Sequence, residues 1–469
     1  MVLGGRVLAA LLSLAILVSA GVAWNRYRQF TADIARVAAI DAKTKPKKDI
    51  DGKDQNILIV GNDDRETATD KELAEIGTTR DGGSLNTDTM MLLHVPANGK
   101  KASAISFPRD SWVNIPGHGT GKLNSAYTDG VGDGNGGRAA GAKLLVTTIQ
   151  NLTGLTVDHY VQVDLLGFFR ISKAIGGVQV CLLKAQNAQT DSDEAGSGYS
   201  GIDLPAGVST IKGKQALAFV RQRHGLPRGD LDRIVRQQYF LSAVFRKMTS
   251  AGTLLNPLKL NSLLSAVSSS LQMDGNSAGH KGLDPIALAR QLENLSTGNL
   301  TFTTIPTGSA TIDGLSVQTV DADQLPVFIA GVIGTAAASA YTKAKTVDPG
   351  SVSVSVLNGT GSSGVAGTNA AVLSKVGFKT TIGDADSSAT TVIRYPAGLE
   401  SQAKTLAGYV PGASVVRSTD VSVVTLVIGS DGKTAVSSKT TAPTAPSKST
   451  PTSAATPGTR TAAQAGCIN

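Results

Sequence analysis

A chain of 469 residues is long enough for two or three domains, and its apolar fraction of 41% is typical of folded protein and not of a disordered chain. The formal net charge of +8 is a modest excess that permits contact with an anionic surface or polymer. Aromatic residues make up only 4% of the chain, which disfavours a protein that binds nucleic acid by stacking on its bases.

The first predicted element is a membrane-spanning helix at residues 7–24. Its eighteen residues carry no charge, and at about 1.5 Å per residue they would extend about 27 Å, close to the thickness of the hydrocarbon core of a bilayer. A cleaved signal peptide is the alternative, because small residues end the apolar run. Arg6 precedes the segment, whereas Arg26, Arg28 and Arg36 follow it, so the charge distribution alone opposes an outward-facing domain.

A charged juxtamembrane linker at residues 25–53 is predicted next, and strands then alternate with helices. The continuous apolar runs are typical of strands buried on both faces, and the helices follow from spacing and capping residues. In chain order we predict strands at 56–61 and 88–95, a strand that ends at Pro108, a helix at 138–152, a strand at 159–164, a helix from its N-cap Asp164 to Gly176–Gly177, and a strand at 178–183. This alternation indicates a layered α/β domain.

The clearest helix in the sequence covers residues 230–250. At 100° per residue, Arg233, Gln237, Phe240 and Val244 share one stripe, which is polar in the first turns and apolar further on. One end of this stripe suits a charged headgroup, and the other suits a lipid or a protein core.

The remainder of the chain divides by composition. A folded extension continues to about residue 335, a linker occupies 336–350, and a small domain of strands and helices occupies 351–430, with a helix at 364–375. Residues 431–469 are rich in Thr, Ser, Ala and Pro, a composition that cannot build a core and predicts disorder.

Several candidate motifs are assigned to structure instead of chemistry. Two cysteines are too few for a disulfide framework: Cys181 lies in an apolar run and is interpreted as a buried small hydrophobe, Cys467 lies in the polar tail, and we expect no bond between them. The glycine-rich stretch 130–137 lacks the ending of a phosphate-binding loop and is interpreted as flexible surface. His224, next to a glycine, is interpreted as a polar surface residue and not as a general base.

Carboxylates lie at the ends of the first predicted strands. Asp63 closes one strand and Asp88 opens the next, and side chains at such ends commonly converge with loop residues. Together with an anionic substrate they would form a reasonable Mg²⁺ site, because this ion takes oxygen ligands from one or two carboxylates and from phosphate. The alternative is that Asp63 and Asp64 only form a turn.

The segment Phe219–Gln238 contains five arginines and no lysine. The guanidinium group is planar and matches phosphate or carboxylate oxygens two at a time, so arginine alone indicates a grip on an oxyanion. Arg221 and Arg223 would grip jointly only if this stretch is extended. Arg233 and Arg236 lie at a helix start, where a cation opposes the macrodipole; Asp230 and Asp232 could compensate, or a pyrophosphate could.

These clusters, in this order, resemble the LytR-CpsA-Psr family of cell-wall glycopolymer ligases. The matching stretches are 56–65, 86–95, 105–117, 122–127 and, most specifically, 216–238. The unit from residue 352 looks like the accessory LytR_C-like domain of many actinobacterial members.

The resemblance implies a layered α/β/α catalytic domain with a central mixed sheet at residues 54–250, anchored once in the cell membrane with residues 1–6 in the cytoplasm and the domain outside. It implies a polyprenyl-pyrophosphate-linked glycan whose lipid lies in an apolar tunnel, with Mg²⁺ on the pyrophosphate. The phosphoglycan, an arabinogalactan or a teichoic-type polymer, would pass to a muramic-acid hydroxyl of peptidoglycan and form a phosphodiester.

The family's functional residues map onto this chain by position. The resemblance assigns Mg²⁺ to Asp63 and Asp88, and the acceptor hydroxyl to Asp230 as the group that orients or deprotonates it. It assigns the pyrophosphate to Arg109, Lys122, Arg221, Arg223, Arg233 and Gln237, with Arg109, Arg221 and Arg223 also counted as catalytic because they would neutralise developing charge. Arg228 and His224 have no matched role.

Two departures from the family pattern concern the acceptor side. Asn86 stands where many members carry an arginine, whose role would fall to Arg65 or Arg80, and residues 66–85 look like an insertion. Two other functions stay open, namely a non-enzymatic binder of anionic polymer, such as a transcriptional attenuator, and a polyprenyl pyrophosphatase with water as acceptor. The predicted anchor and the predicted Mg²⁺ carboxylates count against nucleic acid as a partner.

Overall fold

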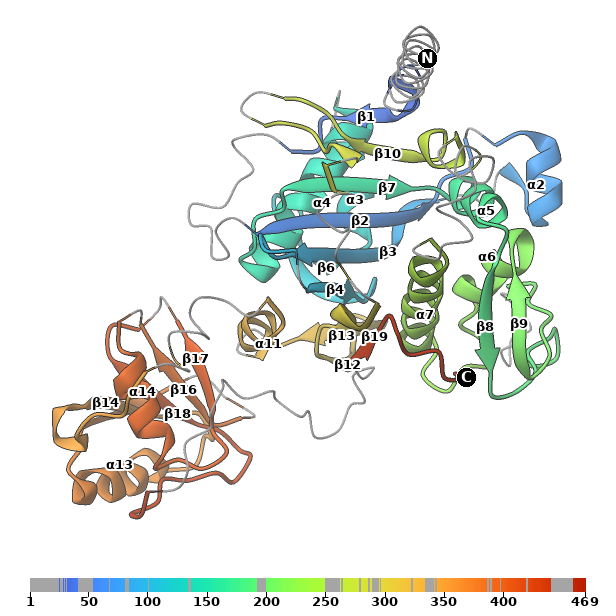
Figure 1. Ribbon diagram of the computed structural model, residues 1–469. Coiled ribbons are helices and arrows are strands. Elements are labelled where there is room, and N and C mark those ends of the chain that lie inside the picture. Colours follow the sequence, from blue (N-terminus) through green and yellow to red (C-terminus); the bar gives the residue numbers. More distant parts are fainter. Residues whose placement is uncertain are drawn as a thin grey trace, which may run out of the picture.

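The protein is described here from a computed structural model that covers residues 25–40, 54–133, 136–191, 200–248, 262–333, 341–439 and 459–469, with short gaps inside some of these ranges (Figure 1). The predicted anchor at 7–24 lies outside the described residues. Among the described residues, no helix combines the length and the apolar character needed to cross a bilayer. The predicted linker at 25–53 includes a short strand, β1 (Ala35–Val37).

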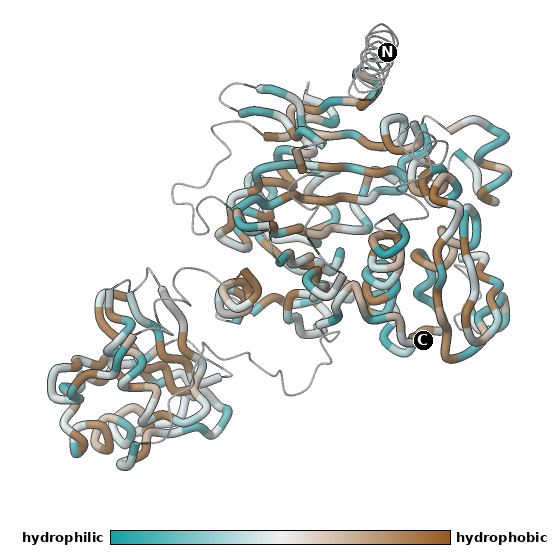
Figure 2. The backbone as a smooth tube through the Cα atoms, in the orientation of Figure 1, coloured by the Kyte–Doolittle hydropathy of each residue, from teal (hydrophilic) through white to brown (hydrophobic). Residues whose placement is uncertain are grey.

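A mixed eight-stranded sheet forms the centre of the larger domain, as the sequence predicted. Its strands, in spatial order, are β1, β10 (Leu271–Asp274), β7 (His159–Val163), β2 (Gln55–Asp63), β3 (Ser84–Val95), β4 (Ala102–Phe107), β11 (Leu300–Thr304) and β19 (Arg460–Thr461). Strand β2 runs antiparallel to β3 and parallel to β7. The central strands carry many hydrophobic residues, including continuous apolar runs in β2 and β3 (Figure 2).

Helices cover both faces of this sheet, which confirms the layered arrangement. On one face, Leu58 and Leu92 belong to a core shared with Val146 of α4 (Gly137–Thr153) and with α3 (Ser125–Gly132). On the other face, Met91 shares a core with Leu241 of α7 (Asp230–Met248). Successive strand residues point to opposite faces, so each strand supplies both cores.

A second core lies beside the sheet, where α7 packs with α5 (Leu165–Ala174), α6 (Gly213–Arg221) and the hairpin of β8 (Val178–Leu182) and β9 (Gly207–Ile211). Helix α5 begins as predicted, because the side chain of its N-cap Asp164 accepts a hydrogen bond from the backbone N–H of Gly167 at 2.6 Å. Residues 66–85, which look like an insertion, include helix α2 (Asp70–Ile76), which pairs with α5 through Arg170 and Glu72 at 2.6 Å.

The expectation of a flexible surface loop at 130–137 is wrong at its beginning, because Gly130–Gly132 form the last turn of α3. Gly130 is buried against α4: a Cβ atom there would lie 2.8 Å from the carbonyl oxygen of Ala140. The glycine permits two helix backbones to approach closely. A four-stranded sheet of β12 (Thr307–Ile312), β13 (Leu315–Val320), β5 (Ser111–Ile115) and β6 (Gly119–Lys122) and helix α11 (Gln324–Ile333) complete this domain.

The expectation of disorder throughout 431–469 is wrong for residues 431–439, where Ala435 is buried in a hydrophobic core, and for residues 459–469. Strand β19 pairs with β11, Ala462 is fully buried, and Ile468 bridges to Leu182. Cys467 forms a disulfide with Cys181, 286 residues earlier, so the expectation of no bond is also wrong. Local composition suggests disorder here, but the segment gains its order by pairing with the edge of a distant strand.

The smaller domain is a separate lobe (Figure 1). Its five strands, in spatial order, are β15 (Lys379–Asp384), β14 (Ser353–Asn358), β18 (Val424–Ile428), β16 (Val392–Tyr395) and β17 (Ser414–Arg417), with helices α13 (Val365–Val376) and α14 (Glu400–Ala407). The predicted helix at 364–375 is therefore confirmed. Tyr341, in the predicted linker, is fully buried in the core of this lobe.

Candidate functional site

A pocket of about 360 Å³ opens where the ends of β2, β3 and β7 meet helices α5, α6 and α7. One part of its lining is apolar and comprises Ile59, Val163, Leu165, Phe168, Leu217, Val220, Phe240 and Leu241. Another part is charged and comprises predicted site residues: Asp63, Asp88, Arg109, Arg221, Arg223, Arg233 and Gln237. The pocket therefore places an apolar surface next to four arginines.

The stripe predicted on the long helix reaches this pocket. Arg233, Gln237 and Phe240 all line it, whereas Val244 does not. The polar-to-apolar change along α7 therefore matches the change from the charged to the apolar part of the lining.

Arg221 and Arg223 reach the same pocket because α6 ends between them. Arg221 is the last helical residue, and Gln222 has extended backbone angles (φ −58°, ψ 130°) and a fully buried side chain. The condition for a joint grip, an extended Arg-Gln-Arg stretch, is met only at Gln222; the chain leaves the helix there, and both arginines reach the pocket. The loop that follows turns at Gly225, whose φ of +71° favours glycine and where a Cβ would lie 1.6 Å from the carbonyl oxygen of Thr190.

Arg236 is a supporting residue and not part of the pocket lining. Its guanidinium is fully buried and donates to Gln222 Oε1 at 2.5 Å and to the carbonyl oxygen of Asn469 at 2.9 Å. Burial lowers the pKa of Arg236 to about 10, against the opposing effect of Asp191 and Asp232, so the side chain is charged at neutral pH. The ordered tail therefore holds Arg236, and Arg236 holds the residue between the two pocket arginines.

Asp230 lies at the start of α7, next to two pocket arginines, and is not itself part of the lining. Its Oδ1 is 2.7 Å from Arg233 Nη2 and 3.4 Å from Arg109 Nε. Burial raises the pKa of Asp230, although Arg233 and Arg109 oppose the shift. Burial lowers the pKa of Arg109, but the charges of Asp230 and Asp88 raise it above its usual value overall. Asp230 therefore orients both arginines.

The remaining predicted contact, Lys122, lies outside the lining and pairs with Asp110 at 2.8 Å. Arg228, in the loop between α6 and α7, pairs with Asp232 at 2.6 Å and does not line the pocket. Asp232 therefore pairs directly with a loop arginine, and it acts on Arg236 only through its charge.

The two predicted metal carboxylates lie in the pocket, and each pairs with an arginine. Asp63 accepts from Arg65 Nε at 2.8 Å, and Asp88 accepts from Arg109 Nη1 at 2.8 Å. Asn62, also in the lining, is buried, and neither its Oδ1 nor its Nδ2 has a hydrogen-bond partner among the described residues. Oxygen atoms from two carboxylates and an amide are a donor set that fits Mg²⁺ once phosphate supplies further ligands.

Arg65 and Arg80 were proposed to take the role of the family arginine that Asn86 replaces, but both are engaged in contacts within the protein. Arg65 is buried against Asp63, and Arg80 donates to the carbonyl oxygens of Glu66 and Ala68 at 3.0 and 2.7 Å. Asn86 itself accepts a hydrogen bond from Thr128 Oγ1 at 2.6 Å. Asp64 points away from the lining and pairs with Arg138.

Sequence reasoning missed several polar residues of the pocket: His224, Asn62, Asp164, Thr89 and Ser200. His224 was interpreted as polar surface, yet it lines the pocket and accepts a hydrogen bond from Arg223 Nε at 3.1 Å. Asn62 and Asp164 also line it, and burial raises the pKa of Asp164. For Asn62 the available signal was its position next to Asp63, and for Asp164 it was its position at the start of a helix.

Comparison with known proteins gives matches over most of the chain. The family model described as the LytR_cpsA_psr family matches residues 23–330, and the one described as LytR cell envelope-related transcriptional attenuator matches residues 351–431. The "LytR-Csp2A-Psr enzyme from Actinomyces oris", a solved structure, aligns over 62% of this chain and 94% of its own chain with 22% identity and a TM-score of 0.42.

Named relatives also match large parts of the chain. The cell wall biosynthesis protein LcpA of Corynebacterium glutamicum is 38% identical over 355 residues, or 69% of this chain and 65% of LcpA. The polyisoprenyl-teichoic acid–peptidoglycan teichoic acid transferase TagU of Oceanobacillus iheyensis is 36% identical over 225 residues, or 47% of this chain and 59% of TagU. The chain thus spans less than two thirds of the length of either relative. Because the first family model covers more than half of the chain, the protein belongs to the LytR_cpsA_psr family.

Proposed function

We propose that this protein is a phosphotransferase that attaches a polyprenyl-pyrophosphate-linked glycopolymer, of arabinogalactan or teichoic-acid type, to a muramic-acid hydroxyl of peptidoglycan. The observation that carries the proposal is the pocket in which Arg109, Arg221, Arg223 and Arg233 adjoin an apolar surface. The names of LcpA, a cell wall biosynthesis protein, and of TagU, a teichoic acid transferase, support the same class of reaction.

The pocket suits a ligand with an anionic head and an apolar chain. Buried guanidinium atoms Arg109 Nε and Arg233 Nε have no hydrogen-bond partner among the described residues, and buried polar groups normally have one. Pyrophosphate oxygens would supply it. At about 30 Å³ per water-sized group, a volume of about 360 Å³ holds about a dozen such groups. A pocket of this size would accommodate only the first isoprene units of the proposed ligand, and the rest of a long chain would extend beyond it.

Mg²⁺ is part of the proposal, held by Asp63 and Asp88 with Asn62 beside them. When bound, the ion would neutralise charge on the phosphate oxygens. The chain's own residues bind and orient the substrate: Arg221 and Arg223 grip the pyrophosphate from the end of α6, and Arg233 does so from α7.

The proposed reaction exchanges a phosphoanhydride bond of the pyrophosphate for a new phosphoester bond. The acceptor hydroxyl oxygen bonds to the phosphorus that carries the glycan, and the bond from that phosphorus to the bridging oxygen breaks. Polyprenyl monophosphate leaves with the bonding electrons, and the hydroxyl proton passes to a carboxylate, for which we propose Asp230. Positive charge from the arginines stabilises the leaving phosphate.

We propose that the catalytic domain is extracytoplasmic and anchored in the cell membrane by residues 7–24. The disulfide between Cys181 and Cys467 supports this location, because disulfides persist in oxidising compartments and are rare in the cytosol. Lipid bilayer, polyprenyl-linked glycan and peptidoglycan are then the partners of the protein.

Native mass spectrometry of the full chain, purified from cell membranes in detergent, tests the proposal. We expect a bound polyprenyl pyrophosphate or monophosphate, and we expect its loss in Arg221→Ala/Arg223→Ala. The matched control Lys375→Ala/Lys379→Ala removes two exposed positive charges from the smaller domain and should retain the lipid. Absence of lipid from the unmodified protein, together with avid binding of duplex DNA, would overturn the proposal in favour of an anionic-polymer binder.

A further inference from the structure

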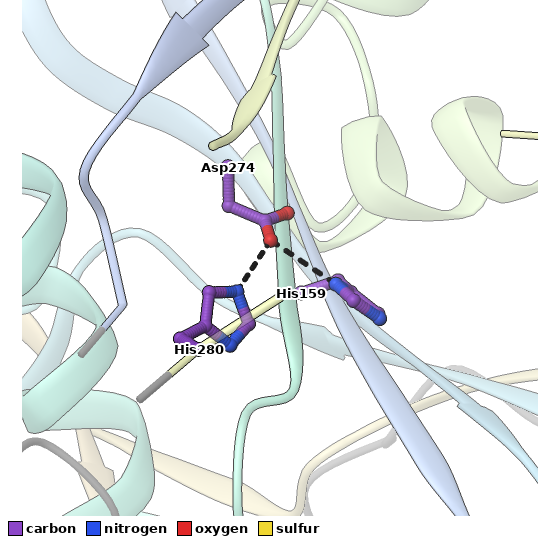
Figure 3. Close-up of side chains that lie close together, drawn as sticks. All are labelled: His159, Asp274 and His280. Atoms are coloured by element: carbon purple, nitrogen blue, oxygen red, sulfur yellow. Dashed lines mark hydrogen bonds and ion pairs between the residues drawn. The ribbon is translucent and has the colours of Figure 1, made fainter. Parts of the chain in front are cut away.

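Two histidines and one aspartate meet at the edge of the central sheet, away from the pocket (Figure 3). His159 begins β7, Asp274 ends β10, and His280 follows in the next loop. One carboxylate oxygen, Asp274 Oδ2, is 3.1 Å from His159 Nδ1 and 2.7 Å from His280 Nε2. None of the three lines the pocket described above.

The carboxylate of this His-Asp-His cluster is held rigidly. Asp274 is fully buried, and its Oδ1 accepts the backbone N–H of Tyr160 at 2.9 Å, while Oδ2 also accepts that of Leu283 at 3.1 Å. The side chains of His159 and His280 are 14% and 5% exposed. Backbone donors that fix a ligating carboxylate are typical of the outer shell of a metal site.

We propose that His159, Asp274 and His280 bind a divalent transition metal of the Zn²⁺ class, distinct from the Mg²⁺ of the pocket. Imidazole nitrogens and a carboxylate oxygen are preferred ligands of Zn²⁺, at about 2.0–2.2 Å, and a tetrahedral ion separates its ligand atoms by about 3.3 Å. To reach this value, the observed separations of 3.1 and 2.7 Å would have to open by about 0.2 and about 0.6 Å, respectively. Three protein ligands leave a fourth position for water.

The ion would join three segments at the membrane-proximal end of the domain. Strand β1, which follows the predicted anchor, pairs with β10 so that Val37 lies opposite Asp274. Arg36 donates to the carbonyl oxygens of Asp274 and Leu283, both at 3.0 Å. A metal on Asp274 would therefore tie β10 and its following loop to β7 next to the strand that leads from the anchor.

The competing explanation is a metal-free cluster in which the imidazoles only donate hydrogen bonds to Asp274. The two explanations differ in their response to added metal. Mg²⁺ discriminates further, because it prefers oxygen ligands and would not compete for two imidazoles.

Co²⁺ titration of the chelator-treated full chain in detergent tests the proposal directly. We expect the intense visible absorption of tetrahedral Co²⁺ to saturate at one equivalent, to disappear when Zn²⁺ is added, and to persist in excess Mg²⁺. His159→Gln and His280→Gln should each abolish this signal. The control His118→Gln, which removes an exposed histidine paired with Asp133, should retain it.

A second readout separates binding from misfolding. Zn²⁺ should raise the thermal unfolding midpoint of the unmodified protein and of His118→Gln, and it should not change that of the two cluster variants, because a ligand stabilises only the state that it binds. Absence of saturable Co²⁺ absorption in the unmodified protein would overturn the proposal, whatever the variants do. An unchanged Co²⁺ signal in both cluster variants would overturn it equally.

Discussion

Replacement of Cys467 by serine should destabilise the catalytic domain through loss of a very long covalent loop. The disulfide joins residues 286 apart in sequence, and the segment that it fastens places β19 on β11 and buries Ala462. The same segment presents the carbonyl oxygen of Asn469 to Arg236. Without the bond, these contacts must hold the segment against the entropy of the intervening chain.

The magnitude follows from the loop length. For a loop of 286 residues the chain-entropy relation gives about 5.6 kcal/mol at 25 °C. Measured values for native disulfides are commonly about 2–4 kcal/mol, because the unfolded chain retains some structure. The intervening chain also contains the separately folded smaller domain, which shortens the effective loop. We therefore expect a loss of about 3 kcal/mol.

Equilibrium unfolding in guanidinium chloride measures this loss, with the fluorescence of Trp112 on β5 as a reporter inside the catalytic domain. Cys181→Ser should cause the same shift of the midpoint, and the double variant should show no further shift, since both remove one bond. The reasoning would be refuted if Cys467→Ser had the same unfolding midpoint as the unmodified protein. Additive losses of stability in the double variant would refute it equally.

Three further predictions concern the pocket arginines and the residues that position them. Burial raises the pKa of Asp230, and a base must be deprotonated to act. The transfer rate should therefore begin to fall, as the pH decreases, at a higher pH than an ordinary aspartate would give. If Asp230→Asn keeps the same fall in rate at low pH, Asp230 is not the base. Gly225→Ala should lower the free energy of unfolding by about 3 kcal/mol in a guanidinium titration, because its Cβ would overlap the carbonyl oxygen of Thr190; an unchanged midpoint would show that the loop adapts. Arg236→Leu should cost about 2–3 kcal/mol by leaving the side-chain oxygen of Gln222 unpaired, and should weaken retention of the lipid in native mass spectra, whereas full retention would show that Gln222 needs no such support.

The fold was predictable wherever local pattern determines structure. Continuous apolar runs identified the strands at 56–61 and 88–95, and the capping residue Asp164 identified the start of α5. Tertiary contacts determine the remainder. Gly130 is helical because a neighbouring helix approaches it, and residues 459–469 are ordered because a strand edge and Cys181 receive them. Composition carries no information on either partner.

The sequence predicted which charged residues form the candidate site, but it did not predict the contacts that hold them in place. The exclusive use of arginine in 219–238 indicated a grip on an oxyanion, and the family resemblance singled out Arg221, Arg223 and Arg233, all of which line the pocket. The links between them were not readable, because Gln222 is held by Arg236, which in turn donates to the carbonyl oxygen of Asn469, more than two hundred residues away. The sequence therefore indicated which charged residues line the pocket, but not the residues that position them.

Transfer in a reconstituted reaction tests the central claim most directly. Full-length protein in detergent would receive a synthetic polyprenyl-pyrophosphate disaccharide, Mg²⁺ and a peptidoglycan oligosaccharide, with products resolved by mass spectrometry. The account predicts an acceptor that carries the phosphodisaccharide and one equivalent of released polyprenyl monophosphate, with both products lost in Arg221→Ala/Arg223→Ala and kept in Lys375→Ala/Lys379→Ala. Release of polyprenyl monophosphate with the phosphodisaccharide found only in solution would contradict transfer and identify a pyrophosphatase.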